Sequence, residues 1–169
     1  MINSTLTLLV FMFVGALTCY SQESENNPGP TPLLRVEVAT VSGMLDQTPK
    51  TLFAVGIDIY ALVSITNNSS EELNMASGHP WRQFNVKLIK DGEVVPFKKS
   101  VSEFLTPSPD KPYGGSIAAF TLKPNASTKE LVHVSEWYES LPPGHYQLTL
   151  GRIWGRAYTA QPVEFDIYQ

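Results

Sequence analysis

Apolar and polar residues alternate along most of the chain from residue 33 to the C-terminus. Between Ile57 and Thr66 every odd position is apolar, whereas Asp58 and Ser64 face the other way. A period of two residues is typical of a β-strand with one buried face. The same alternation predicts strands around Leu34, Val36 and Val38; Phe84, Val86 and Leu88; Val132 and Val134; Tyr146, Leu148 and Leu150; and Val163, Phe165 and Ile167.

Weaker runs of the same kind lie at 94–97 and 117–122, and they leave no room for a long amphipathic helix. An Asp91-Gly92 pair separates two β-prone runs and predicts an antiparallel hairpin, because both residue types tolerate the positive φ of a type I′ turn. Other turn-rich stretches recur at intervals typical of a β-sandwich, and no internal repeat is present. We therefore predict an all-β fold: a single antiparallel sandwich of seven to eight strands at 33–169.

The segment LPPGHY at 141–146 places two prolines and a glycine directly before a strand. In immunoglobulin-like sandwiches, a tyrosine at the start of the penultimate strand buries its ring and sends its hydroxyl to a backbone group upstream. This tyrosine corner predicts a structural role for Tyr146 and for Gly144 in the turn. His145 falls on the opposite face of the strand.

The order of these motifs resembles a widespread group of small exported bacterial immunoglobulin-like β-sandwich proteins. The segments that carry the resemblance are ITNNSSEEL, FNVKLIKDGEVVP, TLKPNAST, LVHVSEWYESLPPGHYQLTL and PVEFDIY, and the most specific part runs from Thr121 to Leu150. The resemblance implies an immunoglobulin-like fold and supplies no catalytic residues. Gly78-His79 and the Asp-Gly hairpin are also similar, more faintly, to the intracellular proteinase-inhibitor sandwich of bacilli.

The first 21 residues have no charged side chain and contain an apolar run from Leu8 to Leu17. As a helix this run would be about 15 Å long, half of the ~30 Å bilayer core, which favours a signal peptide over a membrane span. We predict cleavage after Ser21, a flexible linker at 22–32 that is rich in Asn, Gly, Pro and acids, and a periplasmic or extracellular location.

Cys19 is the only cysteine, and we expect it to leave with the signal peptide. The mature protein would then have no disulfide and would be a monomer held together by its core. Because Ala16-Leu17-Thr18-Cys19 resembles a lipobox, the alternative is a lipoprotein anchored at Cys19.

Candidate chemistry is sparse. His79, His133 and His145 are far apart without metal-ligand spacing, and His133 alternates with two valines as an exposed strand residue would. Nucleophile-elbow, phosphate-loop and dinucleotide motifs are missing from the sequence. The formal charge is −4 with a pI of about 5.3, which disfavours nucleic acid as a partner. We expect no enzyme activity, no metal and no cofactor.

The connections between strands are richer in recognition residues. In an up-and-down path, the loop after the Ile57 strand, the loop at 98–115 and the loop at 153–160 would share one end of the sandwich. Aromatic and arginine side chains on such loops favour binding of a protein or glycan. The candidate binding residues are His79, Trp81, Arg82, Tyr113, Trp154, Arg156 and Tyr158.

Other interpretations stay open. Trp81 and Trp154 would instead plug the open end of the core if they were structural, and an additional strand at Val101–Leu105 would separate the three loops. The alternative functions are a proteinase inhibitor of sandwich form and a structural or accessory envelope protein.

Overall fold

The computed structural model describes residues 33–106, 117–153 and 157–169, which belong to the unit Thr31–Gln169. The expected signal peptide at 1–21, the expected linker at 22–32 and Cys19 lie outside the described residues. Across the described ranges, no helix combines the length and the apolar character required to cross a bilayer.

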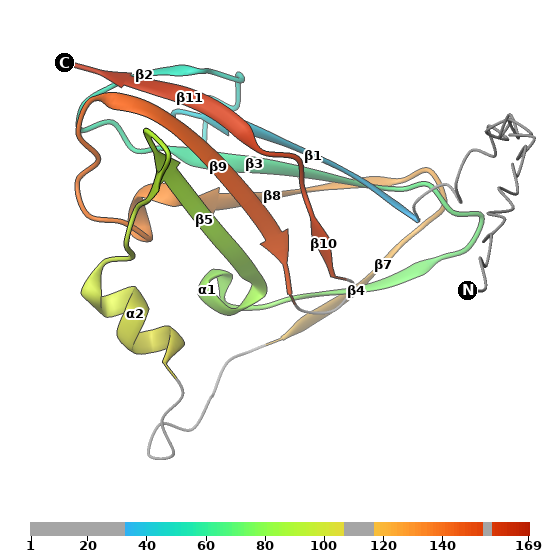
Figure 1. Cartoon of the computed structure of the whole chain (residues 1–169). Coiled ribbons are helices and arrows are strands. Elements are labelled where there is room, and N and C mark those ends of the chain that lie inside the picture. Colours follow the sequence, from blue (N-terminus) through green and yellow to red (C-terminus); the bar gives the residue numbers. More distant parts are fainter. Residues whose placement is uncertain (1–32, 107–116, 154–156) are drawn as a thin grey trace, which may run out of the picture. The chain divides into compact units, whose positions relative to one another are not determined.

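Strands dominate the described residues, which confirms the all-β prediction at this level (Figure 1). There are eleven of them in three sheets, more than the seven to eight expected. Several of the additional strands, such as β2, β6 and β10, are only two or three residues long, too short to show an alternating pattern. The strands are β1 (Leu34–Val41), β2 (Leu52–Ala54), β3 (Tyr60–Asn67), β4 (Leu73–Ser77), β5 (Phe84–Lys90), β6 (Glu93–Val94), β7 (Ala118–Leu122), β8 (Ser127–His133), β9 (Gly144–Arg152), β10 (Tyr158–Thr159) and β11 (Val163–Tyr168).

Within 33–106, 117–153 and 157–169, three short helical segments interrupt the strands. They are α1 (Pro80–Gln83), α2 (Lys99–Leu105) and the 3₁₀ helix η1 (Val134–Glu136). The additional strand considered at Val101–Leu105 is therefore a helix, α2, which buries Val101.

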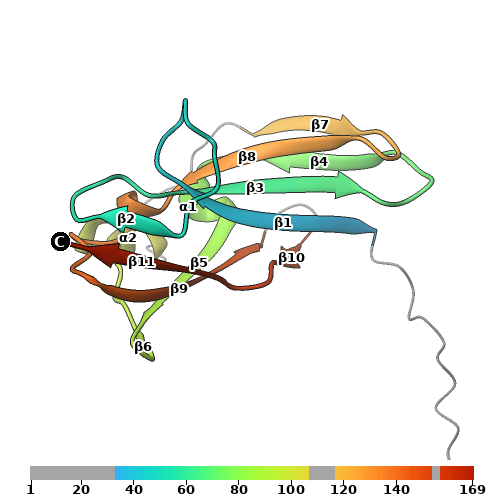
Figure 2. The same cartoon turned by 90° about the horizontal axis from the view of Figure 1, so that it is seen from above.

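Two of the sheets face each other (Figure 2). One has the order β1-β3-β8, and the other has the order β2-β11-β9-β5-β6 with β10 paired to β9. All strand pairs are antiparallel except β2 with β11, which is parallel, so the expected purely antiparallel arrangement is incomplete. The reason is a crossover: the chain leaves β1 in one sheet and enters the facing sheet as β2.

The third sheet pairs β4 with β7 and changes the path of the chain. The connection that follows β3 is not a simple loop, because it contains β4 and α1. Asn67, fully buried, anchors this region through side-chain donation to the carbonyl oxygens of Glu71 (2.7 Å) and Leu122 (2.9 Å). Since β3 pairs with β8 and β5 with β9, the expected up-and-down path is wrong.

The Asp-Gly hairpin forms as predicted. Asp91 and Gly92 have φ values of 49° and 89°, and β5 pairs antiparallel with β6 through Ile89↔Val94. The pairing is short: beyond Val94, the Val95 N–H donates one more backbone hydrogen bond to the Leu88 carbonyl oxygen at 2.9 Å. The expected strand at 94–97 is thus limited to its beginning.

The core lies between the two facing sheets, and its side chains follow the predicted alternation. Trp137 is the largest of the fully buried residues. Ile57 departs from the prediction because it is 47% exposed, and its strand begins only at Tyr60. The core residues of the central strands are Ala61, Val63 and Ile65 of β3, Val86 and Leu88 of β5, Tyr146, Leu148 and Leu150 of β9, and Phe165 and Ile167 of β11.

Tyr146 begins the buried face of β9, and its hydroxyl donates to the carbonyl oxygen of Pro142 at 2.5 Å. Its ring stacks on Phe165 with a centroid distance of 5.3 Å. Gly144 has a φ of +154°, and a Cβ added there would lie 2.4 Å from Cε of Lys90. Both the hydrogen bond and the glycine conformation hold the turn against the start of the strand.

We predict that Tyr146→Phe folds but loses about 1 kcal/mol of unfolding free energy, because it removes one hydrogen bond and keeps the ring. Gly144→Val should cost more, because it adds backbone strain and displaces the Lys90 side chain. Urea unfolding measures both, with Tyr168→Phe on the exposed part of β11 as the matched control. Equal stability of wild type and Tyr146→Phe would contradict the structural role of the hydroxyl.

Candidate functional site

Helix α1 positions three of the predicted binding residues. Its N-cap is His79, which has an extended backbone and whose Nδ1 accepts the Trp81 N–H at 3.3 Å. Pro80 occupies the first helical position, where its fixed φ and missing N–H are tolerated. The helix ends after Gln83, because Phe84 already has the extended backbone of β5. This short turn therefore places His79, Trp81 and Arg82 side by side.

These residues gather around Phe104 of α2. The ring centroid of Phe104 lies 4.9 Å from His79 and 5.2 Å from Trp81, and Cζ of Arg82 lies 4.9 Å above the Phe104 ring. We call His79, Trp81, Arg82 and Phe104 the aromatic–arginine cluster. Sequence reasoning missed Phe104, because it treated this stretch as loop or strand and only the helix turns Phe104 toward α1.

The cluster extends from the surface toward the core. His79 is exposed, whereas Trp81, Arg82 and Phe104 are half-buried. Trp81 also meets the buried Trp137 edge-on, with 6.5 Å between the ring centroids. Trp81 thus closes part of the core with one side of its ring and contributes to the surface with the other.

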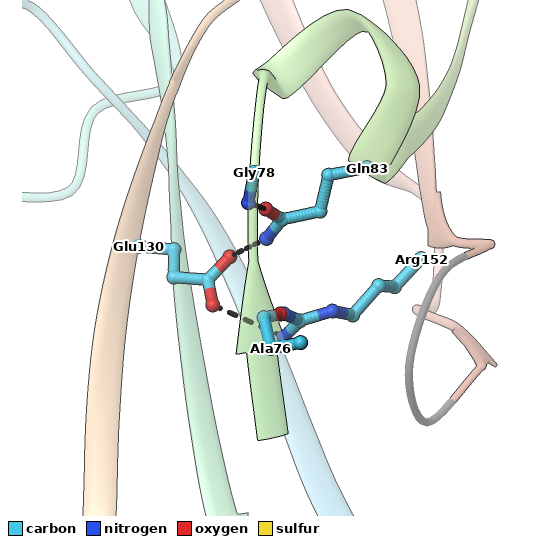
Figure 3. A network of polar contacts seen from close by, with 5 residues as sticks. All are labelled: Ala76, Gly78, Gln83, Glu130 and Arg152. Atoms are coloured by element: carbon cyan, nitrogen blue, oxygen red, sulfur yellow. Dashed lines mark hydrogen bonds and ion pairs between the residues drawn. The ribbon is translucent and has the colours of Figure 1, made fainter. Parts of the chain in front are cut away.

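A buried polar network lies under α1 (Figure 3). Nη1 of Arg152 on β9 pairs with Glu130 of β8 at 3.0 Å, and Nη2 of Arg152 donates to the carbonyl oxygen of Ala76 on β4. The amide of Gln83 donates to Glu130, while Oε1 of Gln83 accepts the Gly78 N–H at 2.7 Å. The network therefore joins all three sheets to α1.

The charged groups of the network are largely buried. The side chain of Arg152 has no exposed surface and that of Glu130 is 15% exposed. Burial raises the pKa of the Glu130 carboxyl, although Arg152 and the Gln83 hydrogen bond pull that pKa down. Because the Arg152 and Glu130 charges are paired with each other, their contact holds the sheets together.

A signal for this pair is present in the sequence. Glu130 has the same strand parity as the buried Val132, and Arg152 has the same parity as the buried Leu150. Two opposite charges on the inward faces of two strands predict a buried ion pair when those strands face each other. Which strands face each other depends on tertiary structure, which the alternation alone does not supply.

Of the four other predicted binding residues, the structure describes only Tyr158. Tyr158 lies on β10 opposite Arg152, packs against the core and has its hydroxyl buried. The Ile153 N–H donates to the Gln83 carbonyl oxygen at 3.0 Å, so the connection that begins there starts beside α1. Tyr113, Trp154 and Arg156 lie outside the described residues.

In the described part of the chain, no group of three or more His, Cys, Asp or Glu residues could hold a metal ion. The sequence pattern predicted that His133 is exposed, but the residue is half-buried. It stacks on Tyr60 at 4.2 Å, and its ring nitrogens lie 3.2 Å from Asp58 and 3.1 Å from Glu136. Each nitrogen therefore lies within ion-pair distance of a carboxylate, although Nε2 makes no hydrogen bond among the described residues.

Comparison with known proteins gives only distant likenesses. No family model matches the chain, and no curated protein matches it. It is similar to alkylpurine DNA glycosylase AlkC of Pseudomonas fluorescens (TM-score 0.42, 9% identity), covering 83% of this chain and 32% of that one. It is similar to β-glucosidase from Listeria innocua (TM-score 0.41, 13% identity), covering 80% and 16%. It is also similar to the PmoD soluble domain from Methylocystis sp. (TM-score 0.28, 11% identity), covering 79% and 90%. The chain thus spans less than a third of the first two proteins, and these likenesses support no conclusion about function.

We predict that removing one member of the buried pair destabilises the fold strongly. Arg152→Met and Glu130→Leu should each lower the unfolding free energy by about 3 kcal/mol, because each leaves a buried polar partner unpaired. The double change Arg152→Met with Glu130→Leu should cost less than the sum of the single changes.

Urea unfolding of the three variants measures this coupling. The matched control is Lys99→Met, which breaks the exposed pair with Glu103 at 3.7 Å and should change stability by less than about 0.5 kcal/mol. Additive effects of the two single changes would show that the buried pair is not coupled.

Proposed function

We propose that residues 33–169 form an immunoglobulin-like binding module of an exported protein, which recognises its partner without catalysis. The sheet orders support the immunoglobulin-like assignment, because β5, β9 and β11 are neighbours in one sheet and β1, β3 and β8 form the facing sheet. The hydrogen bond from Tyr146 to Pro142 has the place and direction of a tyrosine corner. The sheet of β4 and β7 would be an addition to this frame.

The aromatic–arginine cluster carries the functional proposal. Aromatic rings and arginine offer a large contact area together with hydrogen-bonding ends, at a small cost in conformational entropy. Here they sit on two short helices rather than on strands, and the Arg82 guanidinium lies against the Phe104 ring. The buried network also fixes the position of the cluster, since the side-chain amide of Gln83 on α1 donates a hydrogen bond to Glu130.

The ring geometry favours a protein partner over a glycan. A flat sugar ring stacks best on exposed aromatic rings that share a plane. The rings of the cluster instead meet at angles of 65° for His79 with Trp81, 79° for Trp81 with Phe104 and 30° for His79 with Phe104, so no two of them share a plane. Such an uneven surface is better suited to side chains of a partner protein that insert between the rings.

We predict that the cluster selects the partner. The protein immobilised on beads should capture one or more proteins from secreted or envelope extract, and His79→Asn and Arg82→Gln should each reduce that capture at least about tenfold. His79→Asn removes the ring but keeps a good N-cap for α1, so the helix should persist. Quantitative mass spectrometry of the bound fraction measures the loss.

His145→Asn is the matched control, because His145 is an exposed histidine on β9, outside the cluster. It should capture the same proteins as wild type. Identical capture by the control and by both cluster variants would show that the binding surface lies elsewhere. If the wild type captures no protein but binds a glycan array, and both cluster variants lose that binding, the partner is a glycan.

We predict a separate, structural effect for Trp81. Trp81→Ala should lower the unfolding free energy by roughly 2 kcal/mol, because the half-buried ring packs on Trp137 and its loss leaves a gap at the core. Thermal unfolding measures this change. If Trp81→Ala is strongly destabilised while His79→Asn and Arg82→Gln still bind normally, the cluster serves as a core plug and the recognition proposal fails.

A further inference from the structure

Strand β1 is one of the two edge strands of the sheet β1-β3-β8 (Figure 2). It is eight residues long, and its pairing with β3 runs without interruption from Leu34↔Asn67 to Val41↔Tyr60. Among the described residues, no strand pairs with β1 on the side opposite β3. Proteins usually protect such an edge with charged side chains, a proline, a bulge or a covering segment. Strand β1 carries Arg35 and Glu37 but no proline or bulge, and the Lys50 backbone bonds to its outer edge at Thr40.

The hydrogen bonds at the two ends of β1 show which backbone groups point outward. The Leu33 carbonyl oxygen accepts the Asn68 N–H on the β3 side at 2.9 Å, whereas the Thr40 carbonyl oxygen accepts the Lys50 N–H at 2.8 Å. Because backbone groups alternate between the two sides of a strand, the even-numbered residues direct theirs away from β3. Thr40 is already engaged by Lys50, so the outward edge consists of Leu34, Val36 and Val38.

The charges of β1 favour a second copy of the same strand. In an antiparallel pair of two β1 strands related by a two-fold axis at Val36, Leu34 of each copy lies opposite Val38 of the other. These even-numbered positions then form the hydrogen-bonded pairs. Arg35 of each copy lies opposite Glu37 of the other in the closer, non-hydrogen-bonded pairs, where opposite charges stabilise a sheet.

Other registers lack this match. A shift of the axis toward the N-terminus places Arg35 opposite Arg35, and a shift toward the C-terminus places Glu37 opposite Glu37. Like charges directly opposite each other destabilise a strand pair. The charge pattern of β1 therefore selects the register centred on Val36.

The two faces of β1 fit the same arrangement. The side chains of Arg35 and Glu37 are 61% and 65% exposed on the solvent face, where they form an ion pair with each other at 3.6 Å. In the dimer, each would exchange this partner for the opposite charge of the second copy. Leu34, Val36 and Val38 are only half-buried and pack against the edge of the core. In the pair, their apolar side chains would meet those of the second copy and become more deeply buried.

We propose that the protein forms a symmetric dimer in which β1 pairs antiparallel with β1 of a second copy, so that two three-stranded sheets become one six-stranded sheet. This inference is independent of the proposed recognition surface. It replaces the monomer expected from the sequence, because the alternating pattern of β1 does not reveal whether both of its edges are paired.

A charge-swap series tests the dimer. Protein expressed from the full-length chain is measured by sedimentation equilibrium as wild type, as Arg35→Glu, as Glu37→Arg and as the double variant. Each single change places like charges opposite each other twice and should weaken dimerisation about tenfold or more, and the double change should restore it. Lys129→Glu, on the opposite edge strand β8, is the matched control and should dimerise like wild type.

A cross-linking experiment tests the register. In a Cys19→Ser background, Val36→Cys should form a disulfide-linked dimer under mild oxidation, because only this position lies opposite its own copy. Val38→Cys alone should not cross-link, whereas Leu34→Cys with Val38→Cys should. These controls keep the test valid even if one variant is less stable.

Three results would overturn the proposal. The first is a wild-type protein that stays monomeric at roughly 100 μM, a concentration well above the dissociation constants of stable dimers. The second is a dimer that is unaffected by both single charge reversals. The third is a dimer that loses its association only in Lys129→Glu, which would assign the interface to β8.

Discussion

The buried ion pair between Arg152 and Glu130 is the contact on which the arrangement of the three sheets depends. Burying a guanidinium and a carboxylate costs several kcal/mol per ion unless their hydrogen-bonding groups are matched. Here the match is spread over the molecule: Arg152 comes from β9, Glu130 from β8, and the Ala76 carbonyl from β4. Each partner must reach the same point for the charges to be tolerated, so the pair fixes how the sheets approach one another.

The same constraint determines where α1 lies. A four-residue helix has too few hydrogen bonds to persist without tertiary support. Gln83 supplies that support through Glu130 and Gly78, and its carbonyl oxygen accepts the N–H of Ile153. The surface formed by His79, Trp81 and Arg82 is therefore positioned by the network beneath it, and the Gln83 N–H links the two through its hydrogen bond to the His79 carbonyl oxygen at 3.0 Å.

The sequence predicted the elements whose signals are local. Strands such as β3, β5, β9 and β11 follow a period of two residues, and the Asp91-Gly92 turn follows from backbone conformation alone. The features that the sequence did not predict depend on tertiary structure. They are the parallel pairing of β2, the sheet of β4 and β7, and the helix α2, which lies at a position whose pattern also suits a strand. Phe104 was missed for the last of these reasons.

The buried network depends both on a local sequence signal and on tertiary structure. Glu130 and Arg152 each break the apolar alternation on the inward side of a strand, which the sequence displays openly. A single charge on an apolar face can also indicate an edge strand or a strand end. Only the meeting of two opposite charges from different sheets distinguishes a buried pair from these alternatives, and that meeting requires the topology.

The two proposed surfaces would be compatible with each other. Helix α1 contacts β5 and α2, whereas β1 contacts β3 and β11, so pairing through β1 would use other elements than those that carry the aromatic–arginine cluster. A dimer formed in this way would display two copies of the cluster on one rigid frame. A partner with repeated sites would then be held by both copies, and the overall affinity would exceed that of either site without any new contact. A weak single site of four side chains would gain most from such an arrangement, because it has little binding energy of its own.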